Sequence, residues 1–121
     1  MSGRTDLAAA LRAGLAGWRV VDTYRPLDSI TASTVALWTA NVDRLEYNGT
    51  DWLRATVETW ILTPVEKADL VEDSLDDLLT QVLAVIEANP AFTWSTAERA
   101  TLAETFPGWK LPITCLYQIG T

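Results

Sequence analysis

The sequence predicts an α+β fold, a single domain over residues 1–121 in which helices cover one face of a mainly antiparallel sheet. Two observations carry this prediction. Residues 65–89 repeat apolar side chains every three or four positions, as an amphipathic helix does. Two alternating segments meet at Asn48 and Gly49, the residues that a two-residue hairpin turn favours. We therefore expect a central β-hairpin packed on one face by a long amphipathic helix and a short N-terminal helix.

The N-terminal segment predicts the short helix, which Thr5 or Asp6 can cap. Its leucines recur every four residues, at Leu7, Leu11 and Leu15. Gly17 is positioned to end this helix, because glycine readily adopts the left-handed conformation that follows a helix. Residues 18–23 are then expected to form a short strand, and residues 27–34 a loop.

The hairpin is the clearest element, because a regular turn at Asn48 and Gly49 also fixes which residues lie opposite one another. On the face expected to be buried, the pairs are Ala36 with Ile61, Trp38 with Thr59, Ala40 with Val57, and Val42 with Ala55. The opposite face has a polar centre with Asp43 opposite Arg54. Its ends are apolar, with Leu45 opposite Trp52, Leu37 opposite Trp60, and Val35 opposite Leu62. The register therefore places Trp52 and Trp60 on the face that the helices leave bare.

The long helix is expected to bury a stripe that consists of Val71, Leu75, Leu78, Leu79, Val82, Leu83 and Ile86. Its first half is acidic, and Asp69, Asp73 and Asp76 form an exposed stripe near the positive end of the helix dipole. Residues 91–108 allow two interpretations. Ser95 to Glu98 has the form of a helix capping box, but we favour a strand with a turn at residues 106–108.

The last segment, residues 110–119, alternates like a half-buried strand. Pro112 cannot donate a main-chain hydrogen bond, so we expect the strand to be unpaired on one side there. Cys115 lies among the apolar positions and is expected to be a buried filler.

Composition disfavours several classes of function. The net charge of −7 disfavours a nucleic-acid reader, because phosphates would be repelled over most of the surface. The chain has no histidine, the commonest general base and metal ligand. No glycine-rich phosphate loop and no activated serine motif is present, and the acidic stripe lacks the ligand spacing of a calcium loop. We expect no enzyme activity, catalytic residue, metal or cofactor. Without an apolar run long enough to span a membrane or a secretory signal, the chain is expected to be soluble and to stay inside the cell that makes it.

The six tryptophans raise a separate question. Trp18 and Trp38 have apolar neighbours and are expected to belong to the core. Trp52 and Trp60 have two open interpretations. Either they form an exposed interface, which we favour, or the first helix or the loop at residues 27–34 folds over them.

Four segments together resemble a known family. They are GWRVVDTYRP, VETWILTP, ADLVEDSLDDLLTQVLAVIEANP and FPGWKLPITCLYQIG. In their order along nearly the whole chain they resemble the tail terminator (tail completion) proteins of long-tailed, non-contractile bacteriophages. The resemblance lies in the order of elements, the segment LDDLLTQVLAVIEA and the terminal strand, and it supplies no catalytic or ligand residues.

The resemblance implies a structural virion protein, made in the host bacterial cytoplasm and located at the tail–neck junction. Such a protein forms a homo-oligomeric ring of about six copies that caps the tail tube, stops its polymerisation and joins it to a neck or head-completion protein. DNA passes through the ring without specific binding. The candidate interface residues, chosen from the hairpin register, are Leu37, Leu45, Trp52, Arg54, Trp60 and Leu62. The acidic stripe is a candidate lining of the lumen. The alternatives are another head–tail connector or neck ring protein, and a small acidic cytoplasmic adaptor or inhibitor that binds a basic partner.

Overall fold

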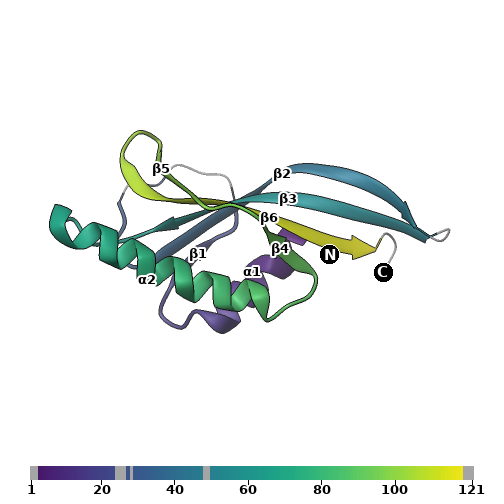
Figure 1. The fold of residues 1–121 in the computed structure, drawn as a ribbon, viewed down its shortest axis with the longest axis horizontal. Coiled ribbons are helices and arrows are strands. Elements are labelled where there is room, and N and C mark those ends of the chain that lie inside the picture. Colours follow the sequence, from purple (N-terminus) through teal and green to yellow (C-terminus); the bar gives the residue numbers. More distant parts are fainter. Residues whose placement is uncertain (1–2, 24–26, 28, 48–49, 119–121) are drawn as a thin grey trace.

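The computed structural model describes residues 3–23, 27, 29–47 and 50–118. Its elements in chain order are α1 (Gly3–Gly14), β1 (Arg19–Val21), β2 (Thr34–Tyr47), β3 (Thr50–Leu62), α2 (Ala68–Glu87), β4 (Phe92–Trp94), β5 (Glu98–Leu102) and β6 (Phe106–Gln118). The strands form one sheet in the order β1-β2-β3-β6-β4, and β5 also pairs with β6. All pairings are antiparallel except that of β1 with β2. Both helices lie on the same face of the sheet (Figure 1), which confirms the predicted α+β class.

The main core lies between the helices and this face of the sheet, which we call the inner face. From α1 it contains Leu7 and Leu11, both fully buried. From α2 it contains Leu78, Val82 and Ile86, which with the fully buried Leu75 are the buried part of the predicted stripe. From the sheet it contains Val57, Ile61 and Ile113. The helix α1 ends at Gly14, three residues before the predicted stop, and Gly17 has the left-handed conformation expected of it, with a φ of 82°.

The β2–β3 register agrees with the prediction near the tip and departs from it further along. Tyr47 pairs with Thr50, and the predicted pairing continues to Asn41 with Thr56. Between Thr39 and Asn41 the register shifts by one residue, so Ala40 is an additional residue in β2. Because successive strand residues point to opposite faces, the shift exchanges the faces of every β2 residue beyond it. The turn at Asn48 and Gly49 lies outside the described residues.

The bulge places Leu37 and Val35 on the inner face, where both are fully buried. The prediction that Leu37 lies opposite Trp60 on a bare face is therefore wrong. Ala36 pairs with Trp60 instead, on the opposite side of the sheet, which we call the outer face. Trp38 moves to the outer face in the same way and is half-buried there.

A second, smaller core covers one end of the outer face. It contains Val21, Ala36, Trp60 and Leu62, of which Trp60 is 6% exposed. Leu27 and Ile30 pack against it from the loop between β1 and β2, and Leu102 and Phe106 pack against it from the β5–β6 hairpin. The expectation that Trp60 and Leu62 face water is therefore wrong. For Trp60 the alternative, a loop folded over it, is the correct one.

The C-terminal region forms strands, as favoured, and contains no helix at the Ser95–Glu98 capping-box sequence. The turn lies at Ala103 and Glu104, whose φ angles are 52° and 59°, so the prediction of a turn at residues 106–108 is wrong. Gly108 belongs to β6, where a Cβ atom would lie 2.5 Å from the main-chain oxygen of Ile61. Glycine is required there by the close approach of two strands.

Pro112 lies opposite Glu58 of β3 on one side of β6. On the other side, the pairing with β5 ends at Lys110 and the pairing with β4 begins at Ile113. Pro112 therefore lies in the gap between two partner strands, which confirms that the strand is unpaired on one side there.

Candidate subunit interface on a projecting arm

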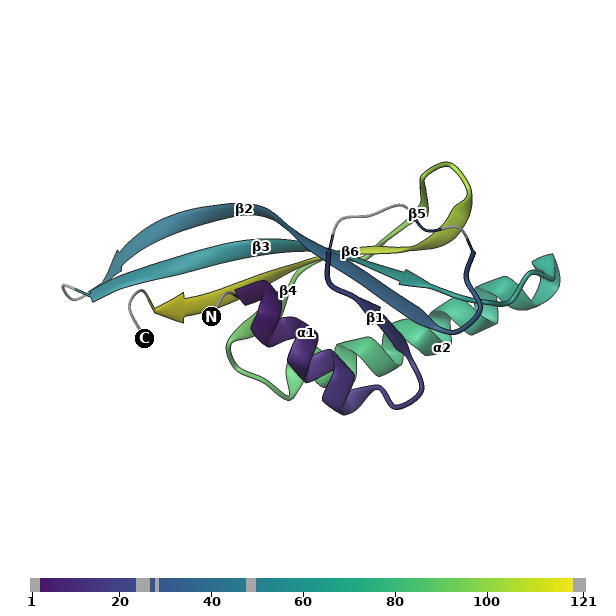
Figure 2. The same ribbon diagram turned by 180° about the vertical axis from the view of Figure 1, so that it is seen from behind.

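Three strands continue beyond the part of the sheet that the helices cover. Figures 1 and 2 show the paired ends of β2 and β3 extending well past α1 and α2, with the end of β6 alongside. We call residues 41–47, 50–56 and 116–118 the arm. The arm is one continuous sheet, because Leu45 pairs with Trp52 and Trp52 pairs with Gln118.

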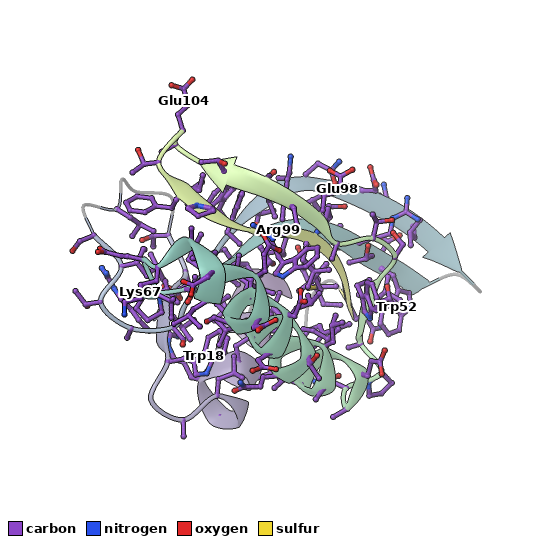
Figure 3. All side chains as sticks on the ribbon, turned by 60° about the vertical axis from the view of Figure 1, so that its left-hand side comes forward. Trp18, Trp52, Lys67, Glu98, Arg99 and Glu104 are labelled. Atoms are coloured by element: carbon purple, nitrogen blue, oxygen red, sulfur yellow. The ribbon has the colours of Figure 1, made fainter. Side chains whose placement is uncertain are left out.

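The outer face of the arm carries an apolar patch beside one ion pair and polar residues such as Asn41 and Thr56. Leu45 and Trp52 lie opposite one another and are half-buried. Leu116 is 41% exposed and lies opposite Arg54. The guanidinium of Arg54 lies 3.1 Å from a carboxylate oxygen of Asp43, so the two charges offset each other. Figure 3 labels Trp52 near this end of the sheet, far from the labelled Trp18. The patch can therefore accept an apolar partner without leaving a charge unpaired.

The inner face of the arm is also apolar, although the helices do not reach all of it. Val42 is 47% exposed there, and Leu53 and Tyr117 are half-buried. The guanidinium of Arg44 lies 2.9 Å from a carboxylate oxygen of Asp51, which forms a second neutral pair. Exposed apolar residues on both faces of one sheet segment make the arm a candidate interface.

The structure divides the six predicted interface residues into two groups. Leu45, Trp52 and Arg54 lie together on the outer face of the arm. Leu37 belongs to the main core, and Trp60 and Leu62 belong to the second core, so these three have almost no surface to offer a neighbour. The separation follows from the bulge at Ala40 and from the loop and hairpin that cover the outer face.

Sequence reasoning missed two residues of this surface. Leu116 lies on the outer face beside Arg54. The alternation of the last segment could have identified it, but the candidate residues come from the register of the hairpin alone. Val42 was assigned to the core because the pattern placed it on the inner face. The alternation does not say where along the strands the helices stop, and Val42 is 47% exposed on the inner face.

The acidic stripe of α2 lies on the solvent-exposed side of the helix. Asp69, Asp73 and Asp76 are exposed, and the ion pairs found among the described residues include none of them. Glu72 differs, because it pairs with Arg99 of β5. Within the described part of the chain, no group of three or more acidic or cysteine side chains converges as a metal site would require.

Hollows elsewhere in the described residues include the following two, and neither of these has convergent titratable groups. One is a groove between α1 and α2, lined by small residues such as Ala13, Ala84 and Ala88. The other lies at the start of α2, where hydroxyl groups such as those of Thr63 and Thr105 line it with a single carboxylate, that of Glu66. Cys115 is fully buried, as expected, and burial together with the nearby carboxylate of Asp6 raises the pKa of its thiol to about 12. A neutral buried thiol is a poor nucleophile.

No protein-family model matches the chain, and a search of curated proteins finds no match. No helix in the described part of the molecule is long and apolar enough to cross a membrane.

Proposed function

We propose that this chain is a structural subunit of a bacteriophage tail, a tail terminator that assembles into a ring of about six copies. The observation that carries the proposal is the arm, which leaves apolar residues exposed on both faces, with Val42 on one and Leu116 on the other. A surface of this kind is stabilised when a neighbouring subunit covers it. The resemblance of the sequence to tail terminators supplies the identity of the assembly.

The shape of the subunit supports a head-to-tail ring. Such a ring needs two different complementary surfaces on each subunit, and the two must lie apart so that the contacts can propagate. The tip of the arm lies at one end of the molecule, and the β5–β6 hairpin lies at the other (Figure 1). The arm is therefore free to reach a neighbouring copy.

The charge distribution is compatible with DNA passage. The net charge is −7, and Asp69, Asp73 and Asp76 add an exposed acidic stripe without ion-pair partners among the described residues. Facing the lumen, this stripe would repel phosphates and keep DNA from binding to the wall. In this proposal the ring caps the tail tube protein, stops tube growth and presents its other side to a neck or head-completion protein. A different neck ring or head–tail connector would use the same features.

The acidic stripe also favours a second candidate function. Three exposed carboxylates on one side of a helix suit a small cytoplasmic adaptor or inhibitor that binds a basic protein. In that case binding would weaken steeply with added salt, and the arm would have no role.

The test is native mass spectrometry and negative-stain imaging of the purified chain, alone and with tail tubes of the phage that encodes it. Rings of about six copies, or rings seated on tube ends, are the expected result. A chain that stays monomeric at high concentration and also leaves tube ends bare would overturn the proposal. Tight, salt-sensitive capture of a basic protein by the monomer would favour the adaptor instead.

A further inference from the structure

In the part of the chain that the structure describes, the side of β2 that faces away from β3 has no strand partner along the arm. The three-residue β1 pairs with β2 only from Thr34 to Ala36, whereas β2 continues to Tyr47. Among the described residues, no other strand pairs with residues 41–47 on that side. We call this side of residues 41–47 the free edge. Such an edge presents main-chain donors and acceptors that match another extended strand.

The hairpin register identifies an amide that points out of the free edge. Tyr47 pairs with Thr50, so two residues connect them, and this closing pair exchanges main-chain hydrogen bonds. Hydrogen-bonded and non-hydrogen-bonded pairs alternate along an antiparallel ladder. Val42 and Ala55 therefore form a non-hydrogen-bonded pair, and the N–H of Val42 points away from β3.

Two-fold pairing of the free edge with itself would not build a ring. Such a contact uses the same surface on both copies, so it joins two subunits and stops. A head-to-tail ring needs two different surfaces on each subunit. In the proposed ring, the free edge therefore suits a different strand of the second copy.

We propose that the free edge of one subunit pairs with β5 of a second copy, so that the sheet continues from one subunit into the next. Within the described residues β5 pairs only with β6, and at five residues it is the longer edge strand on its side of the sheet, where β4 has three. Figures 1 and 2 place β5 at the end of the molecule opposite the arm tip, as a head-to-tail contact requires.

Two ion pairs limit the charge that the arm brings to such a contact. Two subunits that each carry a net charge of −7 repel one another. On the arm, Arg54 is paired with Asp43 and Arg44 with Asp51, so these four charges offset each other. The inference rests on the proposed ring and names the contact that closes it.

The first test compares Val42→Pro with Val42→Thr. Proline removes the outward amide and leaves the β2–β3 hydrogen bonds intact, whereas threonine keeps the amide and a β-branched side chain. We expect Val42→Pro to raise the protein concentration needed for ring formation by about tenfold or more, and Val42→Thr to change it little. If wild-type protein forms rings and Val42→Pro forms them equally well, the edge contact is wrong while the proposed function stands. If wild-type protein forms no rings, with or without tubes, both are overturned.

The second test identifies the partner strand and needs no proline. Val42→Cys and Thr101→Cys subunits are mixed in assembled rings and treated with a flexible bis-maleimide, since the natural Cys115 is buried. Both substituted positions are exposed. A cross-link only between the two different variants is expected. A cross-link between two Val42→Cys subunits would indicate two-fold pairing and would overturn the proposal.

Discussion

The indole Nε1 of Trp109 donates a hydrogen bond of 3.0 Å to the main-chain oxygen of Leu75, which ties the last strand to the long helix. The guanidinium of Arg99 lies over the same ring, 5.6 Å from its centroid, and pairs with Glu72 of the helix. Figure 3 shows Arg99 beside this helix. One tryptophan thus connects β5, β6 and α2, and it anchors the hairpin that covers the second core.

Trp109→Phe tests this connection, because it keeps an aromatic ring and removes the hydrogen bond. We expect the free energy of unfolding to fall by about 1–2 kcal/mol, measured by urea denaturation. The matched control is Trp94→Phe, whose Nε1 lies 3.4 Å from an oxygen of Glu87 in an exposed contact. The control is expected to lose less than about 0.5 kcal/mol. Equal losses for the two variants would show that the bond to Leu75 contributes nothing specific.

Trp60 is expected to tolerate phenylalanine and not alanine. Its side chain is buried in the second core, but its Nε1 has no hydrogen-bond partner among the described residues. Trp60→Ala leaves a cavity and should lower the free energy of unfolding by about 3–5 kcal/mol. Trp60→Phe also removes an unsatisfied donor, so its cost should stay below about 1.5 kcal/mol. Thermal and urea unfolding of the isolated subunit measure both, and a phenylalanine variant as unstable as the alanine variant would refute the explanation.

Substitution of Trp52 should affect ring assembly more than the stability of the isolated subunit, the reverse of the expectation for Trp60. It is half-buried on the arm, so Trp52→Ala is expected to change the free energy of unfolding by less than about 1 kcal/mol. If the arm contacts a second copy, the same change should reduce ring formation strongly, because aromatic side chains contribute heavily to interfaces. Trp60→Phe is the control, since it lies outside the arm. Undiminished assembly by Trp52→Ala would exclude the outer face of the arm from the contact.

The sequence predicts most of the elements, but it does not predict the one additional residue in β2 that decides the face on which the β2 residues beyond it lie. The pair Asn48 and Gly49 correctly predicted the pairing from Tyr47 to Asn41. Alternation could not reveal that Ala40 is an additional residue, because both faces of β2 carry apolar side chains around it. In this part of β2 each face of the sheet is covered by a core, so an apolar side chain can be buried on either face. The local pattern therefore does not specify the register there.

The candidate site was predictable only in part, for a related reason. Leu45 and Trp52 were assigned to the outer face from local pairing, which the bulge does not affect. Trp60 was misplaced because its cover comes from Leu27 and Phe106, which are distant in sequence. Val42 was misplaced because the length of strand that the helices cover is a property of the packed structure. The local sequence predicts which strand residues pair. Whether a residue is buried depends on which distant segments pack over it.

Deletion of Ala40 is expected to be tolerated better than deletion of Thr56. Without Ala40, Thr39 and Asn41 become neighbours and remain on opposite faces, so both cores keep their residues. Without Thr56, Ala55 and Val57 become neighbours although both are buried on the inner face, so one half of β3 must turn over. We expect the Ala40 deletion to unfold cooperatively at a urea midpoint near that of the wild type, and the Thr56 deletion to lose that transition. Similar behaviour of the two deletions would contradict the assigned bulge.

We expect the free energy of unfolding to fall at alkaline pH because of the buried thiol of Cys115. Burial, with a smaller effect of Asp6, raises the pKa of its thiol from 9.0 to about 12 in the folded protein. Below pH 9 both the folded and the unfolded chain keep the proton, so the thiol adds no pH dependence there. Between about pH 9 and 12 only the unfolded chain loses it, so the free energy of unfolding should fall by up to about 1.4 kcal/mol per pH unit. Urea unfolding at about pH 8 and about pH 10.5 measures the change, and Cys115→Ala should remove this part of it while lysines and tyrosines contribute equally to both proteins. The same slope in both proteins would show that the thiol ionises as readily in the folded chain as in the unfolded one.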